Sequence, residues 1–426
     1  MSRRQQASSL SLVAALCFGL QGCGGTDPVA PDASTDVQPL PPSLLPDNVI
    51  VVNDPAALAS RLERTHKVIG LVNEGGSQQQ VTGPNKPGDI GVQLTLVGTV
   101  RPPEVDGIVV QANDVEIYGH TAVIAYNTAG EVFAGAVQVV DFSHPEQPEI
   151  LSEVLYRHAD VNAVALLGNH LYVGLAADDP SLASPALLEE LDLTGATVTR
   201  TGLWLDLPSW ACTDLAVHGE GVVAAVGARD GGVAFVRRDS GLELVGFAPQ
   251  FDARSVALDG DAAFGVGGGE GRLMRHRLPQ MTTESDVAVD GYRNEAAKGT
   301  IEVYAGRSYL GAGDGGLQIH DADGAVLDAL GCSKLTLAGD PAIVNAVTCI
   351  KHLAFVAAGP QGIEVVRLGR YRWDGYASSE TEGLRLLGQL GLEDGASCNM
   401  VKSKNDILVV AAGRGGAKLV SMRFAD

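Results

Sequence analysis

Six residues with hydrogen-bonding side chains stand at the start of similar apolar segments along the chain. They are Asn113, Asn162, Thr213, Arg254, Asn345 and Asn399. Amide and hydroxyl groups donate and accept hydrogen bonds, but they are poor general acids and bases. If these residues gather in space, they favour binding of a ligand or partner over catalysis. The alternative is structural, because Asn and Thr also hold loop backbone where strands begin.

Residues that bind metals or activate nucleophiles are not arranged for that chemistry. Four histidines stand singly at predicted turns: His120, His170, His218 and His352. None forms the His-x-His or His-x-x-x-His spacing of a zinc site. The Asp-Gly-Gly turns at Asp230 and Asp314 each offer one carboxylate, whereas calcium takes six or more oxygens. The sequence therefore predicts no catalytic residue, no metal and no cofactor.

The elements that position these residues come from a unit that recurs seven times from about residue 107. The full unit reads as four short apolar strands, with a Gly-rich turn before the third in every unit except the second, where Ser184-Pro185 lies in a longer insertion. The first two strands of the units align over 113–126, 162–175, 213–226, 254–267, 299–312, 345–358 and 399–412. Four strands per ~45 residues are typical of a β-propeller. The six polar residues would then surround one mouth of its central channel.

The ends of the chain predict how the ring closes. The last unit stops after its third strand, SMRFAD, while the unassigned strand Leu94–Val100 precedes the first unit. We expect that strand to complete the last blade, since closure removes free sheet edges. The prediction is an all-β, seven-bladed propeller over 91–426, closed by an N-terminal strand. A right-handed β-helix is the alternative, but its coil of ~20–25 residues does not match the spacing.

One segment supports a family resemblance. Residues 137–151, VQVVDFSHPEQPEIL, resemble the LVIVD-repeat family of bacterial propeller proteins, in which a strand is followed by Asp, a polar residue and two prolines. Only the first unit matches closely, although the strand pattern covers roughly 92–426. The resemblance implies a propeller that is exported or surface-anchored, and it implies no activity. A WD-repeat propeller is less favoured because the Trp373-Asp374 pair lies outside the expected repeat position.

The N-terminus resembles a bacterial lipoprotein signal. Arg3 and Arg4 precede the apolar run Leu10–Leu20, which is too short to cross a membrane but suits a signal peptide. Leu20-Gln21-Gly22-Cys23 is similar to a lipobox, although Gln21 is unusual there. The resemblance implies removal of residues 1–22 and attachment of lipid, including palmitate, to Cys23. Gly24 favours the outer membrane, and the predicted location is the cell envelope, with the protein facing the periplasm or the surface.

Two segments separate this signal from the repeats. Residues 23–47 carry six prolines and predict a disordered tether after the lipidated Cys23. Residues 48–90 predict a small α/β accessory element. Its parts are a strand at Val49–Asn53, a helix over Ala56–Thr65 with Asp54 as N-cap, and a strand at Val68–Val72.

The formal net charge of −21 predicts a surface that repels anionic lipid headgroups and nucleic acid, so no nucleic acid is expected as a partner. The predicted contact with the membrane is therefore the N-terminal lipid alone. A protein partner in the envelope or outside the cell is expected, and the sequence leaves open whether the protein also binds a small ligand.

Two further groups of residues carry predictions. Cys332 and Cys349 are the expected disulfide, because export leads to an oxidising compartment and 16 residues separate them. The insertion at 368–383 is the predicted partner loop, because its residue types dominate interfaces; it holds Arg370, Tyr371, Arg372, Trp373 and Tyr376. The alternative is a long hairpin that packs its own rings.

Together these features favour a lipid-anchored binding scaffold. An envelope hydrolase or lyase, acting on a glycan or small ester in the channel, is one alternative. A structural component of a surface assembly is another.

Overall fold

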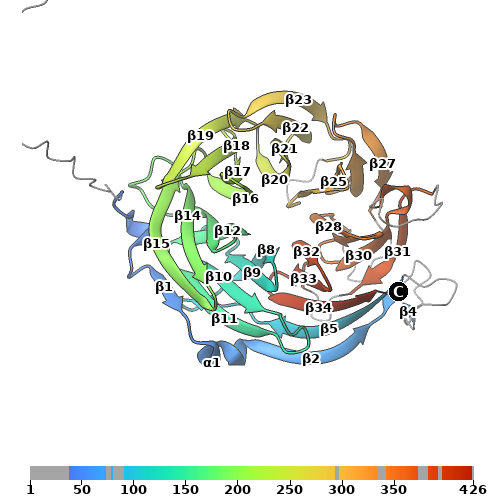
Figure 1. Cartoon of the computed structure of the whole chain (residues 1–426), viewed down its shortest axis with the longest axis horizontal. Helices are drawn as coiled ribbons and strands as arrows, with labels where there is room; N and C mark the ends of the chain where they lie inside the picture. The colour runs from blue at the N-terminus through green and yellow to red at the C-terminus, as the bar shows by residue number, and fades with distance from the viewer. Residues whose placement is uncertain are drawn as a thin grey trace, which may run out of the picture. The chain divides into compact units, whose positions relative to one another are not determined.

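Short apolar strands joined by tight turns form seven antiparallel sheets, which stand as blades around a ring (Figure 1). The computed structural model describes residues 38–72, 78–79, 91–292, 297–332, 342–372, 382–391 and 396–424. Within this part of the chain, each blade runs from an inner strand beside the central channel to an outer strand. The predicted all-β, seven-bladed propeller is confirmed.

The strands of the first four blades follow the chain outward in order. Blade 1 holds β8 (Gln111–Tyr118), β9 (Thr121–Asn127), β10 (Gly135–Asp141) and β11 (Glu149–Tyr156). Blade 2 holds β12 (Ala159–Leu167), β13 (His170–Ala177), β14 (Ala186–Thr194) and β15 (Thr197–Asp206). Blade 3 holds β16 (Ala211–His218), β17 (Gly221–Gly227), β18 (Gly232–Arg238) and β19 (Leu242–Pro249). Blade 4 holds β20 (Ala253–Asp259), β21 (Ala262–Gly267), β22 (Arg272–Arg277) and β23 (Thr282–Ala288).

The last three blades repeat this order until the chain ends. Blade 5 holds β24 (Ile301–Tyr304), β25 (Arg307–Gly311), β26 (Leu317–His320) and β27 (Val326–Leu330). Blade 6 holds β28 (Ala346–Ile350), β29 (Leu353–Ala357), β30 (Ile363–Arg367) and β31 (Arg385–Leu390). Blade 7 holds β32 (Met400–Lys404), β33 (Ile407–Ala411) and β34 (Ala417–Phe424), completed by β5 (Val92–Val100).

The closing strand pairs as the sequence predicted. β5 runs antiparallel to β34, from Val92 opposite Phe424 to Val100 opposite Ala417. The two ends of the propeller are thereby joined by backbone hydrogen bonds. The core lies between neighbouring blades, so strands such as β29 and β33 are buried on both faces.

The accessory element departs from its prediction in its helix. Asp54 does cap a helix, accepting hydrogen bonds from Ala56 N at 3.0 Å and Ala57 N at 3.2 Å. However, α1 covers only Pro55–Leu58, and a 3-10 turn at Ala59–Arg61 leads into strand β2 (Leu62–Ile69). Pairing with the free edge of β5 stabilises an extended backbone there, although the apolar spacing suits a helix.

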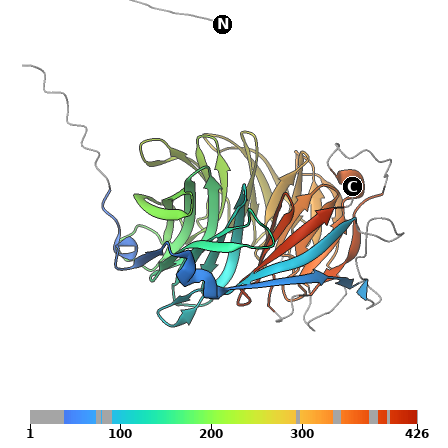
Figure 2. The same cartoon turned by 60° about the horizontal axis from the view of Figure 1, so that its bottom comes forward.

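The strands of this segment extend existing blades instead of packing on one another. We call residues 38–72 the strap; it includes residues 38–47 of the segment predicted as a tether, where Leu44 is buried and Ser43 N donates to Asp179 Oδ2 at 2.8 Å. Its strand β1 (Val49–Val52) pairs with β11, β2 pairs with β5, and β3 (Leu71–Val72) pairs with β31 and β4 (Gln78–Gln79). Figure 2 shows the strap crossing the outside of consecutive blades. It covers outer edges that would otherwise be free to pair with other chains.

Three smaller elements complete the described residues. They are a 3-10 turn at Pro42–Leu44, another at Gly369–Tyr371, and the hairpin of β6 (Glu104–Val105) with β7 (Ile108–Val109).

Candidate functional site

The six predicted mouth residues do lie at equivalent places, where the inner strands begin. We call this side of the ring the mouth face. Asn113, Asn162, Thr213 and Arg254 lie in the first residues of inner strands, and Asn345 and Asn399 lie just before theirs. Turns between second and third strands share this face, since Asn127 Nδ2, at the end of β9, donates to Asn162 Oδ1 at 2.8 Å.

These side chains bind the backbone of the next blade. Asn113 Nδ2 donates to Asn162 O at 2.9 Å, and Thr213 Oγ1 donates to Ala253 O at 2.9 Å. The Arg254 guanidinium donates to Ala297 O and to Asp252 Oδ2.

The same contact recurs around the closure. Asn345 Nδ2 donates to Cys398 O at 3.0 Å, and Asn399 Nδ2 donates to Ala112 O at 3.1 Å. The last contact joins blade 7 to blade 1. This arrangement supports the structural alternative, in which the residues fasten neighbouring blades, and leaves their role as a ligand mouth a prediction.

A second tier of contacts lies one to three residues further along the inner strands. Here a side-chain oxygen accepts a hydrogen bond from a backbone N–H of the next blade. The pairs are Asp114 with Val164 at 3.0 Å, Asp214 with Val256 at 3.0 Å, Ser255 with Ile301 at 3.1 Å, Glu302 with Cys349 at 2.8 Å and Thr348 with Ser403 at 3.1 Å. Sequence reasoning missed this tier, although polar residues such as Asp114 interrupt otherwise apolar strands.

Charged side chains from separate blades meet around the channel. Lys298 Nζ lies 2.9 Å from Asp114 Oδ1 and donates to Asn113 O at 2.8 Å. Lys402 Nζ lies 3.8 Å from Glu116 Oε2 and 3.9 Å from Glu302 Oε2. Burial raises the pKa of both glutamates. For Lys402, burial acts to lower the pKa, but the two glutamates outweigh it and the pKa is raised. The channel wall is thus a network of paired charges. Within the described ranges, no three His, Cys, Asp or Glu residues gather as metal ligands would.

Asp214 makes the stability of the folded protein depend on pH. Burial, with the nearby Asp114 carboxylate, raises the pKa of Asp214 to about 6, although Lys298 opposes the shift. The unfolded value is about 3.9. The folded state therefore keeps a proton between about pH 4 and 6 that the unfolded state has lost. The stability this provides is complete below pH ~4 and disappears as the pH rises through ~6.

Replacing Asp214 with Asn should remove that pH dependence. Relative to wild type, the unfolding free energy of D214N should rise by up to about 3 kcal/mol between pH 4 and 6.5, then level off. His276, whose pKa burial lowers to about 4, has the opposite slope in both proteins and cancels in the difference. Urea unfolding of both proteins from pH 4 to 7.5 checks this. A difference that does not change with pH would contradict it.

The predicted partner loop is only partly described, and two of its side chains face inward. Tyr371 is 5% exposed, and its hydroxyl donates to Leu327 O of blade 5 at 2.9 Å. Arg372 is also buried and donates to Gly369 O at 3.2 Å. Arg370 is exposed and donates to the Tyr371 hydroxyl at 2.6 Å. Trp373 and Tyr376 lie outside the described residues, so a docking role for the loop stays a prediction.

The predicted disulfide between Cys332 and Cys349 is wrong. Both are free, as are Cys212 and Cys398. Cys332 Sγ donates to Gly313 O at 3.2 Å, in a turn on the mouth face, whereas Cys349 lies near the opposite end of β28. Sequence separation could not show that the two thiols lie toward different ends of the blades. Burial raises the pKa of the Cys349 thiol, which makes it a poor nucleophile.

The mouth face also carries exposed aromatic side chains that sequence reasoning missed. Trp210 is 56% exposed just before β16, and Phe251 is 46% exposed just before β20. Phe133 lies between β9 and β10, and its ring centroid is 6.4 Å from the ring centroid of Trp210. We call Phe133, Trp210 and Phe251 the aromatic row. Its only sequence signal was the position of Trp210 and Phe251 within two residues of the start of an inner strand.

Backbone contacts hold the aromatic row in place. Asp160 Oδ1 accepts from Thr128 N at 3.0 Å and Ala134 N at 3.3 Å, which fixes the turn that carries Phe133. Trp210 N donates to Gly227 O, and Asp252 N donates to the adjacent Ala228 O at 3.0 Å. The last two aromatic residues therefore flank one turn of blade 3.

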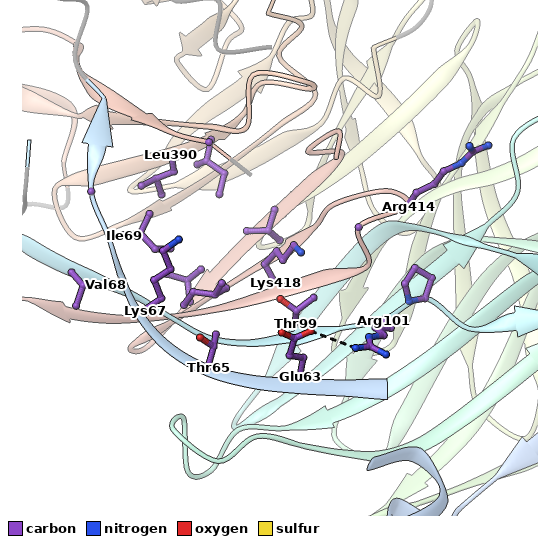
Figure 3. A pocket seen from close by; sticks show the side chains of 18 of the residues that line it. Glu63, Thr65, Lys67, Val68, Ile69, Thr99, Arg101, Leu390, Arg414 and Lys418 are labelled. Carbon is purple, nitrogen blue, oxygen red and sulfur yellow. Dashed lines mark hydrogen bonds and ion pairs between the residues drawn. The ribbon is translucent and has the colours of Figure 1, made fainter. Parts of the chain in front are cut away.

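A cavity of about 1020 Å³ lies between blades 6 and 7 (Figure 3). Two rows of opposed residues on blade 7 form one wall. One row is Val410, Lys418, Thr99 and Glu63, and the other is Val420, Leu96 and Lys67. Blade 6 contributes the opposed pair Ile363 and Leu390, and the strap contributes Ile69, Gly70 and Val72 as it crosses between the blades.

The cavity is lined mainly by cations and apolar groups. Its charged residues are Lys67, Arg101, Arg414 and Lys418 against the single acid Glu63, among the described residues that line it. Arg101 Nη2 lies 3.5 Å from Glu63 Oε2, and Figure 3 shows Lys67 extending from β2 toward Leu390. In a chain with a net charge of −21, this local excess of positive charge is unusual.

No helix among the described residues is long and apolar enough to span a membrane.

Among the comparisons with known proteins, only the comparison of structures finds similar proteins. No family of known proteins and no curated protein matches the sequence. Among solved structures, the WD40 β-propeller domain of Doa1 has a TM-score of 0.54 at 12% identity, covering 78% of this chain and 97% of that one. Saccharomyces cerevisiae Sqt1 has a TM-score of 0.48 at 12% identity, over 74% and 96% of the two chains. The designed Ika8 protein has a TM-score of 0.42 at 15% identity, over 74% and 98%. The Doa1 domain supports the propeller fold, and identities this low show nothing of function.

Proposed function

We propose that this protein is a lipid-anchored β-propeller of the bacterial envelope that serves as a protein-binding scaffold. The aromatic row on the mouth face is the observation that carries the binding role. The lipobox-like Leu20–Cys23 segment, the Pro-rich tether and the LVIVD-like first unit support the anchoring and the location.

The aromatic row has the properties of an interface centre. Trp and Phe bury large areas with little loss of side-chain entropy, and Trp is enriched among residues that dominate binding energy. The backbone contacts of Thr128, Ala134 and Trp210 hold these rings before a partner arrives, which lowers the cost of association.

The charges around the aromatic row favour a basic partner surface. Glu131, Asp178, Asp230 and Glu270 are exposed in turns of the mouth face, where Arg229 is an exposed cation. Complementary charge raises association rates and disfavours acidic partners. We therefore expect the partner to present apolar side chains with Lys or Arg around them.

Crosslinking in intact cells, followed by solubilisation of the membranes, tests the scaffold. Wild type should retain a stoichiometric protein partner, and the W210S/F251S double variant should lose at least nine-tenths of it. The control is Tyr118→Ser, which removes another exposed aromatic ring, at a β8–β9 turn away from the mouth face. Equal loss in the control, or full retention in the double variant, would contradict the proposal.

The anchor is tested separately with labelled palmitate. Wild type should incorporate the label and sediment with membranes, and Cys23→Ser should do neither. Label on the Cys23→Ser protein, or none on wild type, would contradict lipidation while leaving the scaffold test unaffected.

A further inference from the structure

We propose that the cavity between blades 6 and 7 binds an amphiphilic anion, a carboxylate or phosphate joined to an apolar chain. This site is independent of the aromatic row, and it stands or falls without the proposed scaffold function.

The register of blade 7 places head-group and chain contacts side by side. Lys418 lies opposite Val410 on one side and Thr99 on the other, so an amino group, a hydroxyl and an apolar surface face the same space. In the next row, Lys67 lies opposite Leu96. Directly opposed residues of antiparallel strands point to the same face of a sheet, which is why these seven residues form a single wall.

A bulge makes this wall continuous. Gly98 pairs with Leu419 and Leu96 pairs with Val420, so Val97 is an extra residue in β5. In a regular strand, Leu96 and Thr99 would point to opposite faces, because they are three residues apart and side chains alternate; the bulge at Val97 turns both to the same face. The closing strand therefore contributes both a polar and an apolar group to the cavity.

The opposite side of the cavity is apolar and anchored. Ile363 and Leu390 come from paired strands of blade 6. The strap residues beside them are held at both ends, because β2 pairs with β5 and Val72 pairs with Gln389. An acyl chain would lie against Ile363, Leu390 and Val410, where each buried CH₂ contributes about 0.8 kcal/mol.

The charges select the sign of the ligand. Among the described residues, four cationic side chains and one acidic side chain line the cavity, and Lys418 is only 9% exposed. Charges in a partly enclosed site are screened less than charges on the surface, and a cleft of one sign concentrates ions of the other sign. The volume of about 1020 Å³ matches ligand cavities, which hold roughly 300–1,000 Å³.

Calorimetric titration of the full chain, held in nanodiscs of zwitterionic lipid, tests the site. Hexyl phosphate and hexanoate are the probes, and inorganic phosphate and 1-hexanol each carry only one half of the proposed ligand. We expect at least one amphiphilic anion to bind about tenfold or more tightly than inorganic phosphate and 1-hexanol. A tenfold difference corresponds to about 1.4 kcal/mol.

Matched lysine variants locate the site. Lys418→Met and Lys67→Met should each weaken the binding at least tenfold, and Lys418→Arg should retain it. Lys404→Met is the control, because Lys404 lies at the far end of inner strand β32 in the same blade and donates to Ile117 O. Unchanged thermal melting of Lys418→Arg shows that the blade tolerates a change at this position.

Three outcomes would overturn the proposal. They are equal binding of 1-hexanol and the anions, binding of inorganic phosphate as tight as that of hexyl phosphate, and a loss in K404M as large as in K418M. Nanodiscs of anionic lipid distinguish the sources: competition with hexyl phosphate identifies a membrane lipid as the natural ligand, and its absence identifies a free amphiphile. Either result supports the binding of an amphiphilic anion in this cavity.

Discussion

Replacing Arg200 with Met should lower the unfolding free energy by about 3–5 kcal/mol, because it would leave a buried carboxylate without its cation. Glu189 of β14 is 0% exposed. Its Oε1 accepts from Arg200 Nη2 at 2.6 Å and Nε at 2.8 Å, and its Oε2 accepts from the Tyr156 hydroxyl of blade 1 at 2.8 Å. Burial already raises the pKa of Glu189 beside Arg200. Without the guanidinium, the folded protein must protonate this group or keep an unpaired charge.

Urea unfolding at pH 7 measures the effect, and two variants identify its cause. Arg277→Met breaks an exposed pair with Glu284 on blade 4 and should cost less than about 1 kcal/mol. Adding Glu189→Gln to Arg200→Met should recover part of the loss, because a neutral amide is cheaper to bury than a carboxylate. A loss in R200M no larger than in R277M would show that the buried pair does not stabilise blade 2.

Replacing Gly416 with Ala should be the most damaging single methyl addition near the closure. Gly416 has φ +72°, and a Cβ there would lie 1.9 Å from Val100 O of the closing strand. We expect a loss of about 3–5 kcal/mol, combining a left-handed backbone that L-residues avoid with a displaced closing strand. Gly316 and Gly362 occupy the same place in blades 5 and 6, with φ +75° and +84°.

Gly306 provides a matched control for this substitution. Its φ is +69°, but nothing lies within 4 Å of the position of its Cβ. Gly306→Ala should therefore cost only the backbone penalty of about 1–2 kcal/mol. Thermal and urea unfolding of both variants separate crowding at the closure from backbone strain. Equal losses in the two variants would mean that β5 adapts to the added methyl group without cost.

The repeat and its closure were predictable because they depend on local patterns. Alternating apolar residues and turn glycines describe a strand and a hairpin without knowledge of the neighbouring blade. Counting strands then left one missing at the end and one surplus at the start, and the pairing of β5 with β34 confirmed that they match. The turn glycine Gly416 was recognisable for the same reason.

The strap shows where local patterns fail. Residues Ala56–Thr65 have the apolar spacing of a helix, yet Leu62–Ile69 form a strand because the outer edge of β5 offers hydrogen bonds to an extended chain. That edge is created by closure of the ring, so the local sequence of the strap contains no sign of it.

By itself, the sequence determined the strand repeat, the number of blades and the strand that closes them, since each depends on spacing along the chain. The tertiary structure decided everything that depends on contact between blades. Asn399 fastens blade 7 to Ala112 of blade 1, and Cys332 and Cys349 stay apart. Lys67 and Lys418 come to line one cavity although about 350 residues separate them. The physical reason is that a repeat gives each residue its place within a blade, whereas its partners depend on how the blades pack.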